Sequence, residues 1–527
     1  MINISGLDLT IVILYLAATS AIGFFFARTN KGTEEYFAGG RGHHGWLLGL
    51  SLVGYSISSV TFIALPADTY KTAWLRALPY FMVPVAVLIA AVYFIPLFRK
   101  ARVTSAYEYL ETRFGPGVRL YAACMFGIGQ LIRLGVVLYL LAAIVHAMTS
   151  LDPAVCIVIA GVITLVYTLT GGLDAVIWTD AIQAVVLIGG GIVLLWTILA
   201  NIPGGLGQVF SVAWVDNKLS FADMVDGRLV DTTWWPNFFA KSASLMLVVG
   251  LNGRLEEYIS NQNVVQRYVA AKSTAEARKS LIILGTMTIP IWLLFMFIGT
   301  ALYVLYQIHP DPAAHDMLTG AKKAEGILPY FLTRQLPAGM VGLIIAGILA
   351  AAMSSLSSSM NAFSSVAVVD VYRRLLVPGR EDRHYLKAGW VFTILSGIAM
   401  IAGALALLRA PTTTMNDAMT IILGLTGGGM LGLFLMGFIC KRAGSRSITF
   451  GIGTAMIFNL WCILSTATDL VPHAVRSPID NYYAAFLSNV LMMGVGYAAS
   501  LLLPEGKNRA TPPRAVSAGG SNAELKG

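Results

Sequence analysis

The sequence predicts an all-α polytopic membrane protein with about 13 transmembrane helices. Of its 527 residues 57% are hydrophobic and only 12% are charged, and apolar runs long enough to span a bilayer recur along the whole chain. A soluble domain has about 25% charged residues, so a water-soluble protein of this length is excluded. A transmembrane β-barrel is also excluded, because the apolar segments are continuous and do not alternate.

Thirteen apolar segments follow one another with mostly short connections. They cover about residues 7–27, 46–66, 77–98, 117–147, 153–170, 172–200, 238–259, 280–306, 338–363, 385–408, 415–440, 446–468 and 483–503. The first is long enough to span the bilayer and has no basic region before it, so we expect no cleavable signal peptide. An odd number of spans places the two termini on opposite sides of the membrane.

Basic residues indicate the orientation of these spans. Of the 36 Lys and Arg residues, 24 fall in one alternate set of connecting segments and nine in the other. Since cytoplasmic segments are enriched in Lys and Arg, we expect the N-terminus outside and the C-terminus in the cytoplasm of a cell inner (plasma) membrane. The net charge of +9 thus reports orientation in a lipid bilayer, and no nucleic-acid partner is expected.

The extramembrane segments carry no recognisable catalytic motif. The longest connection, 201–237, is too short for a typical independent domain. The tail 504–527 is rich in Pro, Gly and Ser and is expected to be disordered. The sequence has no phosphate-binding GxxxxGK[ST] loop and no HExxH pair, so an ATP-driven pump or a membrane metalloprotease is not supported. The remaining classes are a channel, a secondary transporter and a receptor, and we expect no enzyme.

Polar residues inside the spans mark where function is expected, because such residues are expensive in lipid. The second span contains the stretch GYSISSVT at 54–61, whose glycine and serines favour an unwound turn that frees backbone carbonyls for a cation. Close helix packing through small residues is the alternative. The ninth span has five serines in the six residues 354–359, and neutral hydroxyl oxygens suit a loosely held monovalent cation.

Two charged side chains stand deep in apolar spans. Asp180 lies several residues into the sixth span and should have a cationic partner, for which Arg133, Lys241 and a bound metal ion are the candidates. Arg133 lies midway along the fourth span, where it can neutralise a buried acid or bind an anionic ligand group bidentately.

The seventh span carries a dense polar cluster, NGRLEEY at 252–258. Gly253 followed by Arg254, Glu256 and Glu257 predicts a second broken helix that lines an aqueous cavity. The alternative is that the span ends near Gly253 and the cluster lies at the membrane interface.

Four blocks resemble the sodium/solute symporter family. They are TSAYEYLETRF at 104–114, WTDAIQ at 178–183, NVVQRY at 263–268 and the serine run at 354–359. The resemblance covers the chain from about 7 to 503, and among members it is nearest to bacterial sialic acid symporters. It implies a LeuT-like fold, in which five helices are followed by five more in inverted orientation, with the second and seventh spans as the paired broken helices.

This fold divides the chain into successive parts. They are the first helix and a cytoplasmic loop (1–45), the first repeat (46–200), an extracellular linker (201–237), the second repeat (238–440), two C-terminal helices (441–503) and the cytoplasmic tail (504–527).

The resemblance also implies two sodium sites. The main site would use backbone carbonyls of Gly54, Ile57 and Ala351 with the hydroxyls of Ser354 and Ser355. A second site, present in some members, would use Asp180 with Ser354, Ser357 and Ser358. Sodium would then be the partner of the isolated carboxylate, and two sodium ions would accompany each solute.

The solute site transfers less completely. Small hydroxyl residues of the first broken helix match Ser56, Ser58 and Thr61, and the carboxylate-binding arginine matches Arg133. The next pocket positions, an aromatic and a glutamine in the relatives, align here with Arg76 and Tyr80. Arg254 and Glu256 make the pocket rim more charged than in those relatives.

The sequence therefore predicts a sodium-coupled symporter that imports a small organic solute by alternating access and works as a monomer. The solute is a sugar, a sugar acid such as sialic acid, or a related carboxylate. An amino acid or vitamin symporter coupled to sodium or protons is the first alternative. A channel or a transporter-like sensor is the alternative from another class.

Overall fold

A computed structural model describes residues 5–27, 32–101, 103–149, 151–225, 228–335, 339–409, 429–467 and 471–503. Within these residues the protein is helical apart from one antiparallel hairpin of β1 (Ala222–Val225) and β2 (Arg228–Asp231). The predicted tail 504–527 and the part of the predicted span 415–440 before residue 429 lie outside the described residues.

The helices of the first half follow in chain order. They are α1 (Gly6–Phe26), α2 (Thr33–Ala38), η1 (Gly39–Arg41), α3 (Gly45–Ser56), α4 (Ser59–Lys71), η2 (Leu75–Met82), α5 (Val83–Ile89), η3 (Ala90–Phe94), α6 (Ile95–Ala101), α7 (Tyr107–Phe114), α8 (Pro116–Thr149), α9 (Pro153–Ala200) and α10 (Gly205–Val215).

The helices of the second half begin after the hairpin. They are α11 (Ala243–Ser260), α12 (Gln262–Ala270), α13 (Thr274–Ile308), α14 (Pro312–Thr319), η4 (Ala324–Gly326), α15 (Ile327–Gln335), α16 (Met340–Val366), η5 (Ala367–Leu376), α17 (Asp382–Arg409), α19 (Met430–Ile439), α20 (Ser445–Ala467), η6 (His473–Val475) and α21 (Asn481–Leu502).

The predicted polytopic helical class is confirmed. Among the described residues nine helices are long and apolar enough to cross a membrane, or ten if the bent pair α3 and α4 forms one span. The 48-residue helix α9 is interrupted at Gly172, whose φ of 57° and ψ of −153° are not helical. A straight helix of that length would reach about 72 Å at 1.5 Å per residue, more than twice the thickness of a bilayer core.

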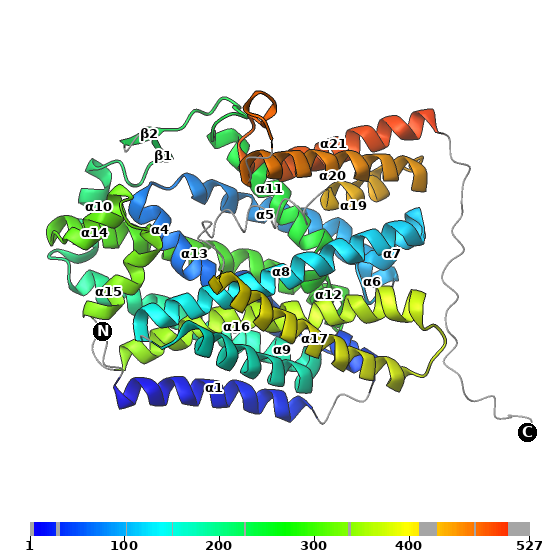
Figure 1. The fold of residues 1–527 in the computed structure, drawn as a ribbon, viewed down its shortest axis with the longest axis horizontal. Helices are drawn as coiled ribbons and strands as arrows, with labels where there is room; N and C mark the ends of the chain where they lie inside the picture. Colours follow the sequence, from blue (N-terminus) through cyan, green and yellow to red (C-terminus); the bar gives the residue numbers. More distant parts are fainter. Residues whose placement is uncertain are drawn as a thin grey trace, which may run out of the picture.

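The helices differ sharply in burial. In the most apolar window of the segment 340–376, which contains α16, 89% of the residues are buried, whereas the corresponding value for α1 is 11%. Figure 1 shows α1 along one edge of the bundle and α20 and α21 along the opposite edge. The central helix α16 carries the serine run, so the hydroxyl groups predicted to bind a cation lie in the middle of the protein.

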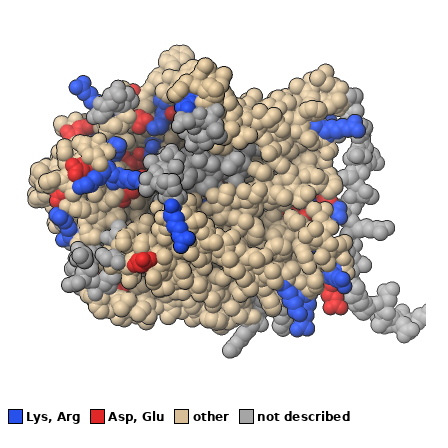
Figure 2. Space-filling view, viewed as in Figure 1, with Lys and Arg blue, Asp and Glu red and all other residues tan. Residues whose placement is uncertain are grey.

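Charged residues gather towards the two ends of the bundle. Figure 2 shows most visible Lys, Arg, Asp and Glu side chains at the left and right of the molecule, with a broad uncharged band between them. At the left end, one set of ends of the long helices lies together with α10, α14, α15 and the hairpin (Figure 1). This distribution fits helices that cross a bilayer along the long direction of the view.

The structure contains two interrupted helices at the expected positions in the chain, but one break lies elsewhere than predicted. Helix α3 ends at Ser56, Ile57 is extended, and α4 leaves at an angle of 55°. Gly253 lies inside the continuous helix α11, so the predicted break there is wrong. The break falls instead at Asn261, whose φ of −83° and ψ of 114° separate α11 from α12 and whose side chain caps α12.

Candidate sodium and solute sites

The residues of the predicted main sodium site meet where α3 ends against α16. The Ser354 hydroxyl donates to the carbonyl of Gly54 at 2.9 Å and to that of Ala351 at 3.2 Å. The Ser355 hydroxyl donates to the carbonyl of Tyr55 at 3.4 Å. The carbonyls of Gly54 and Tyr55 have no partner within α3 because the helix ends at Ser56. Carbonyl and hydroxyl oxygens therefore converge here, as a hard cation requires.

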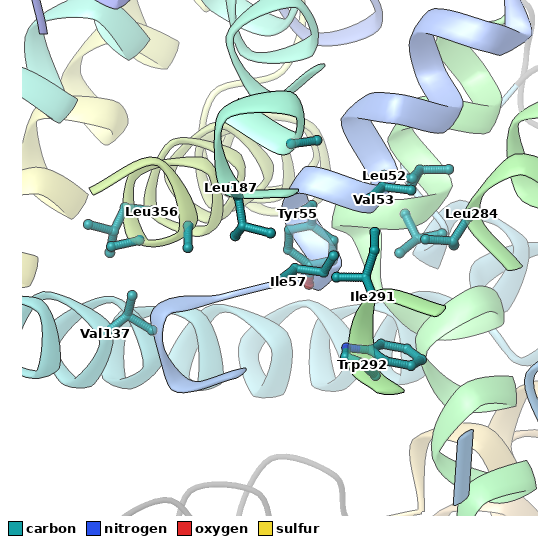
Figure 3. Close-up of a cluster of buried hydrophobic side chains, with 14 of the residues drawn as sticks. Leu52, Val53, Tyr55, Ile57, Val137, Leu187, Leu284, Ile291, Trp292 and Leu356 are labelled. Atoms are coloured by element: carbon teal, nitrogen blue, oxygen red, sulfur yellow. The ribbon is translucent and has the colours of Figure 1, made fainter. Parts of the chain in front are cut away.

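Two further features define this junction. Ile57 is fully buried at the interruption, with its backbone extended and its N–H bonded to Val53. In Figure 3, Tyr55 and Ile57 lie among the apolar side chains of neighbouring helices, including Leu187 and Ile291. The polar oxygens are thus enclosed by an apolar shell that excludes bulk water and strengthens their attraction for a cation.

The residues of the predicted second sodium site also lie close together. The Ser358 hydroxyl donates to Asp180 Oδ2 at 2.8 Å, and the Ser357 hydroxyl donates to Oδ1 at 3.4 Å. Ser354 joins this group through its carbonyl, which accepts the Ser357 hydroxyl at 3.2 Å. Asp180 has no exposed surface, so its carboxylate must be neutralised within the protein.

The cation beside Asp180 in this structure is Arg267. Its Nη2 lies 2.5 Å from Asp180 Oδ2 and 2.6 Å from the Ser358 hydroxyl, and its Nε donates to Ser51 at 2.8 Å. Neither of the residues predicted as partner fills this role. Arg133 contacts Tyr55, and Lys241 pairs with Asp223 at 2.7 Å.

Arg133 on α8 reaches the same junction from the other side. Its Nη1 donates to the Tyr55 hydroxyl at 3.0 Å, and its guanidinium lies 5.1 Å from the centre of the Tyr55 ring. Asn261, at the break between α11 and α12, donates to the same hydroxyl at 2.9 Å. Tyr55 therefore connects both helix breaks with the arginine predicted to bind the solute carboxylate.

The hydroxyls of Ser56, Ser58 and Thr61 lie at or just after the first break. None of the three makes a hydrogen bond to another residue in the described part of the chain, and all three are partly exposed. Their hydroxyls are therefore not engaged by other residues of the described chain, and their role in binding a solute stays a prediction.

The other residues predicted to bind the solute form a separate polar cluster. The Arg254 guanidinium lies 5.1 Å from the centre of the Trp292 ring and pairs with Glu257 at 2.5 Å. Tyr80 stacks on the same Trp292 ring at a centroid distance of 4.3 Å. Arg76 forms an ion pair with Asp68. Glu256 turns towards α21, where it accepts from Asn489 at 3.4 Å.

Four residues of these sites were missed by sequence reasoning: Tyr55, Asn261, Arg267 and Trp292. Tyr55 lies inside the quoted stretch 54–61, but its aromatic side chain gave no sign of a ligand role. Arg267 was counted among the cytoplasmic loop charges, although it lies in the NVVQRY block. Asn261 carries a detectable signal, since an Asn directly before a helical segment is a common N-cap.

Carbonyl and hydroxyl oxygens that gather where an interrupted helix meets a serine-rich helix, beside a buried carboxylate, fit a cation-coupled membrane transporter. A profile described as the Sodium:solute symporter family matches residues 36–452. The chain belongs to this family, whose members are transporters and not enzymes, and sodium is the coupling ion.

Two bacterial relatives agree with this assignment. The sodium/sialic acid symporter SiaT of Proteus mirabilis (strain HI4320) is 34% identical over 444 residues, which are 84% of this chain and 86% of SiaT. The sodium/sialic acid symporter NanT of Aliivibrio fischeri (strain ATCC 700601 / ES114) is 30% identical over 495 residues, which are 94% of this chain and 93% of NanT.

Solved structures agree on the fold. A Na⁺-coupled sialic acid symporter in a substrate-bound outward-open state, described as revealing a novel Na⁺ site, matches with a TM-score of 0.85 at 29% identity. The match covers 95% of this chain and 98% of that protein. The nucleobase-cation-symport-1 family transporter Mhp1 matches with a TM-score of 0.52 at 15% identity, which supports the fold alone.

Proposed function

We propose that the protein imports a sugar acid of the sialic acid type together with two sodium ions by alternating access. The observation that carries the solute class is that Arg133 forms no ion pair in the described part of the chain. Four other buried or half-buried arginines each pair with a carboxylate: Arg76 with Asp68, Arg119 with Asp370, Arg254 with Glu257 and Arg267 with Asp180. Among the described residues Arg133 forms no ion pair with a carboxylate, and both its hydrogen bond and its cation–π contact are with Tyr55.

A guanidinium group offers five N–H donors in a geometry that matches a carboxylate. With one donor used by Tyr55, Arg133 keeps enough donors to bind a solute carboxylate bidentately. The neighbouring hydroxyls of Ser56, Ser58 and Thr61 suit the hydroxyl groups of a sugar. The similarity to the sodium/sialic acid symporters SiaT and NanT supports the same solute class.

The polar cluster around Arg254 argues against an amino acid as the solute. An ammonium group would need a free carboxylate, but Glu257 is neutralised by Arg254 and Glu256 is directed to Asn489. The acidic residues that left a zwitterionic solute open in the sequence thus have partners within the protein.

Tyr55 supplies a physical link between sodium and solute. Its carbonyl receives the Ser355 hydroxyl at the proposed main sodium site, and its own hydroxyl binds Arg133. Sodium at Gly54, Ile57, Ala351, Ser354 and Ser355 would fix the backbone of Tyr55 and, through the ring, the position of Arg133. A coupling of about 1–3 kcal/mol between the two ligands would follow, and it must act equally in both directions.

The second sodium ion is assigned to Asp180 with Ser354, Ser357 and Ser358. Two sodium ions with one monovalent anion move one net positive charge inward, so the membrane potential contributes about 2.3 kcal/mol per 100 mV to import. Uptake would therefore be electrogenic. A protein with one sodium site would carry this anion without net charge.

The finer architecture is part of the same proposal. The protein would have thirteen transmembrane helices with inverted repeats at 46–200 and 238–440. The remaining parts would be the first helix with its loop (1–45), the linker (201–237), the two C-terminal helices (441–503) and the tail (504–527). We place the N-terminus outside and the C-terminus inside the cell inner membrane, with the monomer as the functional unit. The breaks after α3 and α11 occupy equivalent positions in the two repeats, which supports this division.

The carboxylate contact can be tested by comparing sialic acid with its methyl ester. Uptake into proteoliposomes should favour the free acid strongly, and Arg133→Lys should raise its half-saturating concentration roughly 10- to 100-fold, as loss of a charge-assisted bidentate contact of about 1.5–3 kcal/mol requires. Arg228→Lys, on the exposed strand β2, is the control and should change nothing. Equal uptake of acid and ester would refute the solute class.

A further inference from the structure

An apolar groove of about 520 Å³ lies between the linker helix α10 and helix α13. Only apolar and aromatic residues line it: Trp74, Phe210, Leu219, Pro290, Leu293, Leu294 and Phe297. Its volume lies within the roughly 300–1,000 Å³ typical of small-ligand sites. The one polar group of the lining, the indole N–H of Trp74, is already bonded to the Thr300 hydroxyl at 3.0 Å. Such a groove cannot orient a sugar acid and suits a purely apolar ligand.

Helix α10 presents a second apolar surface that nothing in the described chain covers. Leu206, Phe210 and Trp214 recur every four residues and form one stripe, with exposed fractions of 49%, 49% and 78%. The adjoining face is apolar as well, since Val209 and Ala213 are fully buried against the bundle. An apolar surface that extends past the buried stripe of a helix favours an apolar environment on its exposed side.

The rest of the linker has the composition of a membrane interface. Trp234 and Trp235 follow the hairpin and are largely exposed, as is Phe239. Tryptophan is enriched where lipid headgroups meet the hydrocarbon core. In Figure 1, α10 and the hairpin lie at the left end of the bundle, beside the outer ends of the long helices, which is the level at which an interface is expected.

We propose that α10 lies in the lipid interface and that the groove between α10 and α13 binds one acyl chain of a phospholipid. The choice of lipid rests on continuity, because Pro290, Leu293, Leu294 and Phe297 of the groove belong to α13, one of the candidate spans. A chain in the groove continues the hydrocarbon that covers the outside of α13. The proposal is independent of the solute, and only the name of the leaflet, the outer one, depends on the proposed orientation.

The groove adjoins the segment that holds the outer half of the first broken helix. Trp74 donates its backbone N–H to Ser220 of the linker at 2.8 Å. Two residues earlier along the linker, the Lys218 ammonium binds the carbonyls of Tyr70 and Thr72 at the end of α4. An acyl chain between α10 and α13 would therefore pack against the linker next to the residues that hydrogen-bond the end of α4.

Photo-labelling of the full chain tests the site directly. The protein is reconstituted in nanodiscs of phosphatidylethanolamine and phosphatidylglycerol with a trace of phosphatidylcholine that carries a diazirine on one acyl chain. Label should map to 206–219 and 290–297 at least fivefold above the hairpin segment 228–231. Leu293→Trp, which fills the groove, should lower this labelling at least fivefold. Leu14→Trp, at an exposed apolar position of α1, is the matched control and should leave it unchanged.

Groove labelling no higher than that of the hairpin, or unaffected by Leu293→Trp, would overturn the proposal. Efficient cross-linking of the Phe210→Cys variant to a second copy would also overturn the proposal, because a partner protein would then cover the stripe. A second measurement does not depend on the filling variant. A nitroxide at Phe210→Cys should collide with oxygen more readily than with a water-soluble nickel chelate, as one at Leu14→Cys does, and the reverse order would also refute the proposal.

Discussion

Gly54 is the position at which the structure predicts the sharpest effect of a single methyl group. A Cβ at this residue would lie 2.4 Å from the carbonyl oxygen of Asp180 and 3.1 Å from its carbonyl carbon. Ordinary carbon–oxygen contacts in proteins are roughly 3.3–3.6 Å, so the overlap is about 1 Å. The obstacle is helix backbone, which cannot rotate away, and Gly54→Ala must push α3 and α9 apart.

This displacement acts on both proposed sodium sites, because Gly54 supplies a carbonyl to one and Asp180 supplies the carboxylate of the other. Overpacking of this kind costs about 1–3 kcal/mol. If that strain appears in the sodium-bound state, the half-saturating sodium concentration for uptake rises about 5- to 150-fold. Sodium titration of uptake in proteoliposomes measures it, with melting temperature recorded in parallel.

Gly253→Ala is the matched control. A Cβ at Gly253 meets no atom within 4 Å, and the residue lies inside helix α11. The change should leave sodium dependence unaltered and stabilise the protein by about 0.5–1 kcal/mol, because alanine loses less backbone entropy than glycine. Half-saturating sodium for Gly54→Ala within twofold of the parent, or an equal loss with Gly253→Ala, would refute the assignment of the α3 break to sodium.

Three further predictions concern single side chains. Asp180→Asn should lower the sodium Hill coefficient of uptake from near two to near one, and a coefficient still near two would remove the second site. The substitution also leaves the buried Arg267 without its carboxylate partner, so the double variant with Arg267→Gln should regain thermal stability without regaining binding of the second sodium ion. Ser355→Ala should abolish uptake with an unchanged melting temperature, and undiminished uptake would count against the main site. Burial lowers the pKa of Lys218 from 10.5 to about 7, and Asp68 and Asp216 oppose this shift. Between these two pH values the unfolded chain binds more protons than the folded chain, so the stability of the protein rises with pH. The melting temperature of the parent relative to Lys218→Met should therefore rise from pH 6 to pH 9, and a fall would contradict the buried state of this amine.

Local sequence was sufficient for the elements whose signal is carried by neighbouring residues. Apolar runs gave the spans, and α1, α8, α17 and α20 begin and end within a few residues of the predicted limits. The serine run and Asp180 were also visible, because polar side chains stand out in an apolar helix whatever it packs against.

Arg267 could not be placed in this way. The nine-residue helix α12 carries four charged or amide-bearing side chains, Gln262, Asn263, Gln266 and Arg267, so the sequence predicts a cytoplasmic connection, yet every one of its residues is buried. Its burial depends on packing against distant helices, which no local pattern records. An arginine assigned to a loop was therefore never considered as the partner of Asp180.

The position of the second break shows a different limit. Gly253 is permissive for a break but does not require one, and in α11 nothing approaches closely enough to disturb its helix. Asn261 stops the helix because its side chain caps α12 and at the same time binds the Tyr55 hydroxyl. A contact with a residue some 200 positions earlier in the chain fixes the break.

Uptake of sialic acid by the purified protein in proteoliposomes tests the central claim most directly. With an inward sodium gradient and an inside-negative potential, the account predicts accumulation above the external concentration, which collapses when potassium replaces sodium outside. Accumulation that is unaffected by sodium, or no uptake of any sugar acid in the presence of the gradient, would contradict it.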